Sequence, residues 1–525
     1  MKTFTLIERV KYLIASGANP RDILLVTFTN NAAREMLERI DNSDVLACTF
    51  HSLCYRLLRE FLPGDRRPFT VLDEDDMTKM LSSITTDLGY SIATKLVVDH
   101  IGMMRSKGTP PPSPCNPDDV IGIIYGEYEV LRKNHNMYDF GALQVDALEF
   151  APLVVGRWKY LLIDEYQDTD PVQWELTRIL EQGAESVTVV CDDQQSIYGW
   201  RGADISNVLK FPEIFNAEVI TLRENFRSTP EIVDIVNRVV MSAKEKLGDK
   251  DLVFVKENGS KPRILTYRDD RAEARGIVDM IVNRGTPSDH LILYRANWLS
   301  RLIEEELMRV RMPYKVMDSV CFYRRREIKD IIAYIRLIYN PLDEVAARRV
   351  INTPPRGIGK VTVENAIQTY GSLCEAIVRS NNEKISTFRG IIEWVRSEST
   401  TPADMIQRII KMIKYEEYIG EKDRIDNINS LVSGAAAFGG VLDDYMMVVT
   451  LLSDDNVQSS DKCVKMMTIH AAKGTEAKYV YVIGLEDDIL PHSFSSNVEE
   501  ERRLFYVAVS RAKDDLIMAT AMGRW

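Results

Sequence analysis

The stretch Tyr160-Leu161-Leu162-Ile163-Asp164-Glu165 decides the fold, because it places two carboxylates directly behind a short apolar run. A run of this length, bounded by polar residues, predicts a buried strand. Comparable runs recur with helix-patterned segments between them, at residues 23–28, 187–191, 264–267, 291–294 and 479–483. Alternation of strand and helix indicates α/β cores built on parallel sheets.

These runs form two groups, divided at about residue 215, and a long helix-patterned stretch interrupts each group. A chain of 525 residues has room for three to four domains at ~150 residues each. We therefore expect two α/β cores, each with a mainly helical insertion. The first core comprises residues 1–52 and 145–215 around an insertion at 53–144, and the second comprises residues 216–339 and 462–525 around an insertion at 340–461.

The composition is that of an ordinary globular protein, with 45% hydrophobic and 27% charged residues. The longest apolar runs are strand-sized, so the sequence predicts no membrane-spanning helix, and its first residues lack the pattern of a signal peptide. The seven cysteines are dispersed and never spaced as CxxC, which argues against a disulfide framework or a structural zinc site. These features favour a cytoplasmic protein with no membrane partner.

The charge balance argues against a protein that coats polyanions in general. There are 66 basic and 78 acidic residues, a net charge of −12, so any contact with nucleic acid must be local. One local excess exists between Cys321 and Lys360, where nine Lys and Arg residues face four Asp and Glu residues, a net charge of +5.

The two carboxylates behind the strand at 160–163 suggest phosphoryl chemistry. In P-loop NTPases a carboxylate in this place holds Mg²⁺ and a neighbour prepares the attacking water. Asp164 would then face the metal and Glu165 would be the base. The alternative is the acidic start of a helix, since Asp and Glu favour first turns.

A second polar stretch, residues 190–202 (VCDDQQSIYGWRG), follows another apolar run. It combines amides, aromatic rings and an arginine, which a hydrophobic core would not contain. Tyr198, Trp200 and Arg201 suit stacking on unpaired bases together with a phosphate contact. The alternative is a partly buried tryptophan that fixes a loop.

Eight ordered stretches together resemble the UvrD/Rep/PcrA-type superfamily 1 DNA helicases, and they run along nearly the whole chain. The resemblance implies two RecA-like P-loop NTPase domains. The matching stretches are TFTNNAAREM (27–36), TFHS (49–52), DEYQD (164–168), DDQQSIYGWRG (192–202), LRENFRS (222–228), YRAN with Ser300, Arg301 and Glu304 (294–304), TIHAAKGTE (468–476) and EEERRLFYVAVSRAK (499–513).

The resemblance implies an ATP-dependent DNA helicase that moves 3′ to 5′ on single-stranded DNA, with ATP and Mg²⁺ as cofactors. ATP would sit between the two cores. Gln195 would touch the γ-phosphate, and Arg227 and Arg511 would be arginine fingers, beside the base Glu165. Lys2, Thr3, Phe226, Gly474 and Glu476 would bind the nucleotide, with Thr3 and Asp164 also at the metal.

For DNA, the resemblance implies stacking faces at Phe28, Tyr198 and Trp200, with Asn30, His51 and Arg201 near the backbone. A structural role for His51 stays open as the alternative. The segment NTPPRGIGK (352–360) resembles a family segment that contacts duplex DNA, through Arg356, Gly357, Gly359 and Lys360. The alternative there is an ordinary turn between helices. Expected partners are single-stranded DNA, duplex junctions and accessory replication or repair proteins.

The phosphate-binding loop GxxxxGK[ST] of such enzymes is the one part without a full counterpart. Lys2 and Thr3 resemble its last two residues, with Met1 where the final glycine belongs. We expect a truncated form of a longer helicase, with poor ATP binding as it stands. The alternatives are a natural variant that is an ATP-independent single-strand DNA-binding or partner subunit, and a helicase–nuclease fusion, which predicts a further C-terminal domain.

Overall fold

The computed structural model describes residues 2–64, 69–72, 74–109, 119–248, 250–317, 322–436, 442, 445–446, 462–493, 495 and 497–524. The chain divides into two compact units. The first unit comprises Met1–Arg223, Val240–Asp251 and Arg502–Leu504, and the second comprises Glu224–Val239, Leu252–Glu501 and Phe505–Trp525. The finer division into two cores and two insertions stays a prediction.

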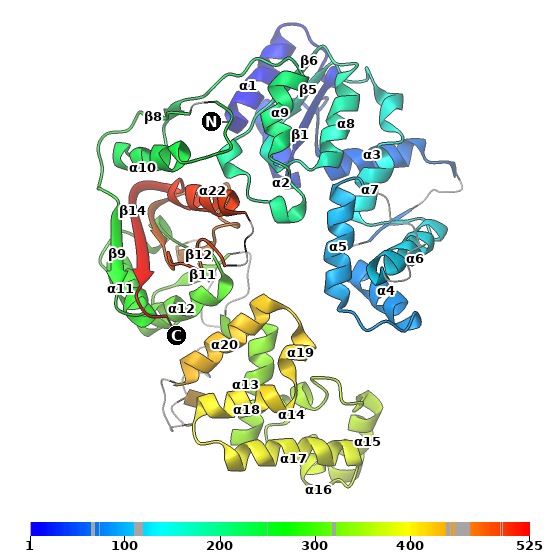
Figure 1. Ribbon diagram of the computed structural model, residues 1–525, viewed down its shortest axis with the longest axis vertical. Helices are drawn as coiled ribbons and strands as arrows, with labels where there is room; N and C mark the ends of the chain where they lie inside the picture. Colours follow the sequence, from blue (N-terminus) through cyan, green and yellow to red (C-terminus); the bar gives the residue numbers. More distant parts are fainter. Residues whose placement is uncertain are drawn as a thin grey trace. The chain divides into compact units, whose positions relative to one another are not determined.

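A four-stranded parallel sheet forms the centre of the first unit (Figure 1). Its strand order is β2-β1-β5-β6, with β1 at Ile23–Thr27, β2 at Leu46–Thr49, β5 at Tyr160–Ile163 and β6 at Ser186–Val189. In register, Val26 of β1 lies opposite Ile163 of β5, which in turn lies opposite Val189 of β6. The carboxyl ends of these three strands therefore meet at one edge of the sheet.

Helices cover both faces of this sheet. This explains why all five residues of β1 are buried and why all of them except Thr27 are apolar. Ile23 and Leu25 pack with α1 (Lys2–Ala15) and α2 (Asn30–Ile40) on one face. Leu24 and Val26 pack on the other face. The helices there are α3 (Phe50–Phe61), α7 (Phe140–Ala147), α8 (Pro171–Glu181) and α9 (Ser206–Ile214).

Three further helices of the first unit form a separate apolar cluster. They are α4 (Glu74–Asp87), α5 (Thr94–Ser106) and α6 (Val120–Asn134), beside the short parallel pair β3 (Thr70–Val71) and β4 (Met137–Tyr138). Leu81, Val97, Ile101 and Tyr125 are buried among them. α5 also packs against α7 and so joins this cluster to the sheet layer.

The second unit holds a six-stranded parallel sheet with the order β11-β12-β10-β13-β14-β9. The strands are β9 (Arg263–Tyr267), β10 (His290–Tyr294), β11 (Tyr314–Val316), β12 (Val464–Thr468), β13 (Ala477–Val482) and β14 (Ala512–Ala521). Helices α11 (Asp270–Val282) and α12 (Ser300–Arg309) contribute Ile277 and Ile303 to its apolar core. Helices α10 (Pro230–Met241) and α22 (Val498–Val509) and the short pair β7 (Glu224–Asn225) and β8 (Val253–Phe254) complete the described elements near this sheet.

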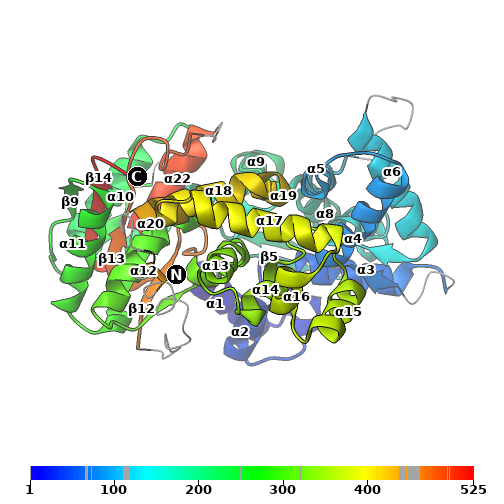
Figure 2. The ribbon, with the colours of Figure 1, turned by 90° about the horizontal axis from the view of Figure 1, so that it is seen from below.

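A helical layer with its own core makes up the rest of the second unit. Tyr334, Phe388, Ile406 and Leu431 are fully or almost fully buried in that core. In Figure 2, α17 and α18 lie alongside each other. The helices are α13 (Arg326–Tyr339), α14 (Glu344–Val350), α15 (Lys360–Tyr370), α16 (Leu373–Arg379), α17 (Glu383–Glu398), α18 (Pro402–Met412), α19 (Tyr415–Ile419) and α20 (Lys422–Ala436).

The predicted α/β fold with parallel sheets is confirmed. All pairings within the two large sheets are parallel, and six of the ten strands lie on the apolar runs identified in the sequence, shifted by at most two residues at the start of a run. Within the described ranges, no helix is both long enough and apolar enough to cross a membrane. Met1, predicted to stand in place of a loop glycine, lies outside the described residues.

Candidate functional site

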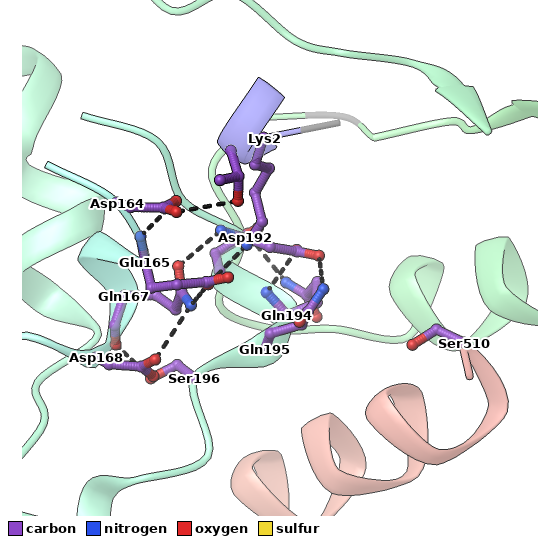
Figure 3. A network of polar contacts seen from close by, with 12 residues as sticks. Lys2, Asp164, Glu165, Gln167, Asp168, Asp192, Gln194, Gln195, Ser196 and Ser510 are labelled. Carbon is purple, nitrogen blue, oxygen red and sulfur yellow. Dashed lines mark hydrogen bonds and ion pairs between the residues drawn. The ribbon is translucent and has the colours of Figure 1, made fainter. Parts of the chain in front are cut away.

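Acidic and amide side chains of the first unit gather at the carboxyl ends of β5 and β6 (Figure 3). Asp164 and Glu165 directly follow β5, and Asp192 follows β6 after two residues. The backbone N–H of Asp164 donates to Val26 O at 2.9 Å, and that of Tyr166 donates to Val190 O at 3.1 Å. These bonds continue the sheet pairing past the strand ends, at the edge where open α/β sheets bind their ligands.

The first two described residues of the chain reach the same place. The Nζ of Lys2 lies 2.8 Å from Oε2 of Glu165, and the hydroxyl of Thr3 donates to Oδ2 of Asp164 at 3.1 Å. Both residues begin α1, which Leu6, Ile7 and Val10 anchor to the sheet. The structure thus brings together two pairs of side chains whose members are more than 160 positions apart in sequence.

Charges in this cluster influence one another strongly. Burial lowers the pKa of Lys2, but the carboxylates of Glu165 and Asp192 outweigh burial and hold that pKa above its usual value. Burial, together with the neighbouring Glu165, raises the pKa of Asp164. Burial also acts to raise the pKa of Asp192, yet Lys250 and Lys2 hold it well below its usual range. The lysines therefore keep Asp192 ionised.

Gln167 links the two strand ends, and sequence reasoning gave it no role. Its Nε2 donates to Oε2 of Glu165 at 2.5 Å, and its Oε1 accepts the backbone N–H of Asp192 at 2.9 Å. The amide can do both at once because its nitrogen donates while its oxygen accepts. Glu165 itself has a φ of 50°, a left-handed conformation that is uncommon for a residue with a side chain. The side chain of Gln167 thereby fixes the carboxylate on its strained backbone.

Gln195 and Lys250 both contact Asp192. The Nε2 of Gln195 donates to Oδ2 of Asp192 at 2.7 Å, and the Nζ of Lys250 lies 3.0 Å from its Oδ1. Lys250 also pairs with Asp193, whose side chain is fully buried. Sequence reasoning missed Lys250, because it lies 58 positions from Asp192 in a segment without a motif.

Aromatic rings are exposed in the loop that follows Gln195. The ring of Phe28, behind β1, stacks on that of Tyr198 with centroids 5.6 Å apart and planes at 7°. The guanidinium of Arg201 lies 4.6 Å from the ring of Trp200. Trp200 is 60% exposed and Phe28 is 45% exposed. The loop offers rings to solvent, and the alternative of a partly buried tryptophan does not describe Trp200.

His51 and Asn30 lie near this edge with different surroundings. The Nε2 of His51 lies 3.1 Å from Nε2 of Gln144, and the edge of its ring meets Phe140. Burial lowers the pKa of His51, so the ring is neutral near pH 7 and accepts from Gln144. This arrangement resembles that of a satisfied structural histidine. Asn30, the first residue of α2, is exposed and accepts from the hydroxyl of Ser52 at 3.4 Å.

In the second unit, the structure brings Arg227, Glu476 and Arg511 together. Arg227 donates to Oε2 of Glu476 at 2.7 Å and to the carbonyl of Ser510 at 3.0 Å. Arg511 is 1% exposed and donates to the Ser510 hydroxyl at 2.8 Å and to two backbone carbonyls. Bonding to Lys513, with Arg227 nearby, lowers the pKa of Glu476.

The remaining residues predicted to bind the nucleotide lie close in sequence to this cluster. Phe226 precedes Arg227 and is 53% exposed. Gly474 precedes Glu476 by two residues and has a φ of 82°. At that φ a side chain would be strained.

In the segment 352–360, the side chain of Arg356 forms hydrogen bonds with other groups of the protein. Asn352 Oδ1 accepts the backbone N–H groups of Arg356 and Ile358 at 2.7 and 3.2 Å. The Arg356 guanidinium donates to two carbonyls at 3.1 Å and to the Tyr334 hydroxyl at 2.5 Å. Its predicted contact with DNA stays a prediction, and the geometry adds a structural role.

The exposed positions of that segment are Pro355, Gly357, Gly359 and Lys360. Sequence reasoning missed Lys384, whose Nζ donates to the Gly357 carbonyl at 3.1 Å. Lys384 lies on α17 and adds a cation to this segment, in which Lys360 is the first residue of α15.

The donor set around Asp164 fits a magnesium ion held with phosphate. Mg²⁺ prefers oxygen ligands and is usually bound through one or two carboxylates plus substrate phosphates. Asp164 and Thr3 supply a carboxylate and a hydroxyl that already lie within hydrogen-bond distance. Within the described residues, no group of three or more His, Cys, Asp or Glu side chains could hold a metal by itself.

Comparison with known proteins assigns the family. Residues 2–216 match the model of the UvrD/REP helicase N-terminal domain, and residues 220–523 match that of the UvrD-like helicase C-terminal domain. A probable DNA helicase II homolog of Rickettsia conorii is 33% identical over 100% of this chain and 89% of its own length. The ATP-dependent DNA helicases PcrA of Bacillus subtilis and Staphylococcus aureus are 32% and 30% identical, over 100% of this chain and 80% of their own lengths. The chain belongs to the UvrD-like DNA helicases.

Proposed function

We propose that this chain is an ATP-dependent DNA translocase and helicase that tracks single-stranded DNA from 3′ to 5′. The observation that carries the proposal is the pairing of Lys2 with Glu165 and of Thr3 with Asp164 at the carboxyl ends of β5 and β6. A lysine that could bind phosphate and a hydroxyl that could bind metal, beside two strand-end carboxylates, are among the groups that ATP hydrolysis uses in P-loop enzymes. The names of the PcrA relatives support ATP dependence, and the direction rests on the family resemblance.

At the nucleotide, each residue would perform one task. Thr3 and Asp164 would hold Mg²⁺, which supplies positive charge to the phosphate oxygens. Lys2 would bind the phosphates, and Glu165, oriented by Gln167, would accept the proton of the attacking water.

Other residues would sense and stabilise the transferring group. Gln195 would exchange its bond to Asp192 for one to the γ-phosphate. Arg227 and Arg511 would supply charge for the transition state. Phe226 would stack on the adenine, Glu476 would contact the ribose, and Gly474 would allow close approach of the backbone.

At the DNA, the exposed rings of Phe28 and Trp200 and the partly buried ring of Tyr198 would stack on bases, and Asn30 and Arg201 would contact the backbone. His51 belongs to the same proposed set. Tyr198 follows Gln195 by three residues, so a movement at the γ-phosphate would directly reach residues 196–204, which we call the base-stacking loop.

At duplex junctions, Gly357, Gly359 and Lys360, with Arg356 shaping their loop, would contact phosphates. We infer a cytoplasmic location from the dispersed cysteines, and accessory replication or repair proteins as partners from the family resemblance.

The test measures DNA-stimulated phosphate release and the unwinding of duplexes with a 3′ or a 5′ tail. The chain is assayed as it stands and with a segment of GxxxxG pattern joined ahead of Lys2. We expect hydrolysis and unwinding of the 3′-tailed duplex in the extended form, and their loss in Glu165→Gln. The control Glu185→Gln changes an exposed glutamate of the same unit and keeps both activities.

Two results would contradict this proposal. Normal hydrolysis by Glu165→Gln would remove Glu165 as the base. Tight single-strand binding without hydrolysis in either form would favour the alternative, an ATP-independent DNA-binding subunit on a helicase scaffold.

A further inference from the structure

Gly202, at the end of the base-stacking loop, lies against α5 with no space between them. Gly202 ends the 3₁₀ turn Gly199–Arg201 with a φ of 94°. A Cβ placed on it would lie 2.2 Å from Oγ and 2.3 Å from Cβ of Ser106, far inside van der Waals contact. Ser106 is the last residue of α5, and it is buried. The loop therefore rests directly on the end of this helix.

The end of α5 is itself held by a buried group of charges. Arg105, which is 3% exposed, pairs with Glu129 of α6 and with Asp139 at 3.2 Å. Arg132 donates to both oxygens of Glu129 at 2.6 and 2.8 Å. The Oδ1 of Asp139 accepts the N–H of Ala142 at 2.7 Å and so caps α7. α5, α6 and α7 are thus locked together at the height of Ser106.

Close packing adds to this lock. A Cβ on Gly141, in the first turn of α7, would lie 2.7 Å from Cβ of Arg105. The hydroxyl of Ser106 donates to the carbonyl of Met103 at 2.9 Å, so its rotamer is fixed within α5. A movement of the loop toward α5 would displace Ser106 or Arg105 and would therefore disturb the buried ion pairs of Arg105.

The base-stacking loop is fastened on its other side to the strand-end site. The N–H of Asp204 donates to the carbonyl of Thr169 at 3.0 Å, and the Asn207 amide donates to the same carbonyl at 3.0 Å. Thr169 lies four residues after Glu165. Tyr198 and Trp200 are therefore carried on a short loop between the carboxylate site and α5.

We propose that Ser106 and Arg105 are positioning residues for the base-stacking loop: Ser106 holds the loop by steric contact at Gly202, and the ion pairs of Arg105 hold the end of α5 that carries Ser106. Neither side chain touches DNA in this proposal; they fix where the rings of Tyr198 and Trp200 stand. The consequence is that a rearrangement of α5 changes DNA affinity through the loop. The role of the loop in binding DNA rests on the proposed function, whereas the contact itself does not.

The first test enlarges the residue beneath the loop. Ser106→Leu forces Gly202 and its neighbours away from α5, and Ser82→Leu makes the same change at an exposed position of α4. We expect Ser106→Leu to weaken binding of a fluorescent oligothymidine between about 5-fold and 100-fold, the range for the loss of one stacked base. Hydrogen exchange of residues 196–204 should rise in the DNA-free protein, and Ser82→Leu should change neither quantity.

The second test uses paired small changes, in case Ser106→Leu does not fold. Gly202→Ala introduces the Cβ that Ser106 excludes, and Ser106→Gly removes the obstructing atoms. We expect the double variant to bind DNA better than Gly202→Ala alone, although part of the loss persists because φ at position 202 stays strained. As a control, Gly202→Ala combined with Ser82→Gly should bind DNA no better than Gly202→Ala alone.

The two readouts separate failure of the contact from failure of the proposed function. Unchanged exchange in Ser106→Leu, or strictly additive effects in the Gly202→Ala and Ser106→Gly pair, would overturn the proposal. If the protein binds no single-stranded DNA, the exchange and the melting temperature of the same variants still decide whether the contact exists.

Discussion

Removal of the Lys250 ammonium is the sharpest test of the charge arrangement at the strand ends. Lys250→Met keeps most of the side-chain volume but removes the cation that pairs with both Asp192 and Asp193, so that Lys2 remains as the cation acting on Asp192. Breaking a fully buried ion pair by removing one partner costs about 3–5 kcal/mol. The Lys250 side chain is 19% exposed, and neutral donors remain at both carboxylates, among them the Gln195 amide and the Leu247 N–H. We therefore expect a loss of about 2–3 kcal/mol at pH 7.

The pH dependence of this loss follows from Asp192. Its pKa in the folded protein is held below the ordinary value. Such a group stabilises the folded state fully above its unfolded pKa of about 4, and the contribution disappears as the pH falls through the folded pKa. The difference between wild type and Lys250→Met should be constant above about pH 5 and should shrink below about pH 4.

Native-state hydrogen exchange of β6 amides measures this difference in the first unit alone, since the two units need not unfold together. Lys95→Met is the matched control, because Lys95 pairs with Glu74 and Asp99 at an exposed site and its loss should cost less than about 1 kcal/mol. Equal losses in Lys250→Met and Lys95→Met at pH 7 would show that the buried pair adds nothing.

The other expected outcomes concern the sites one residue at a time. Trp200→Ala should weaken single-strand binding by about 5-fold to 100-fold in fluorescence anisotropy, and an unchanged affinity would remove this ring from the binding surface. In the form extended ahead of Lys2, Gln167→Leu should lower kcat of ATP hydrolysis by up to about 100-fold through misplacement of the base, without changing DNA affinity. Lys360→Ala should reduce the slope of log affinity for a duplex junction against log salt by about one, as expected for one lost phosphate contact. His51→Gln should reduce the acid sensitivity of unfolding below about pH 6.5, because the unfolded wild-type chain takes up a proton at His51 there while the buried ring of the folded protein, whose pKa is lowered, stays neutral.

The strands that could be predicted from the sequence were those recognisable from their own residues, as continuous apolar runs. β1, β5 and β10 are continuous apolar runs, because helices cover both faces of a central parallel strand. β12 and β14 were missed because their sequences are not continuous apolar runs of this kind. β12 (VKMMT) contains a lysine and two methionines, and β14 begins with Ala-Lys-Asp-Asp, so neither start has the character of a strand.

The candidate site divides in the same way. Asp164 and Glu165 could be predicted because they stand directly behind a strand. Lys250 could not, because its partner is set by the path of the chain after α10 and leaves no local pattern. Arg356 shows a third case, in which residue type suggested a phosphate contact while the fold gives its guanidinium three internal acceptors.

The ion pair between Lys2 and Glu165 also bears on the proposed hydrolysis, because it joins the group proposed to bind phosphate to the group proposed to act as the base. At 2.8 Å the Lys2 ammonium would weaken the Glu165 carboxylate as a proton acceptor, because a neighbouring positive charge disfavours its protonation. Lys2 has a single ammonium group, and once a phosphate engages it, Glu165 is released to take a proton. Binding of the nucleotide would then itself activate the base, and without bound nucleotide Glu165 would remain inactive in its ion pair with Lys2.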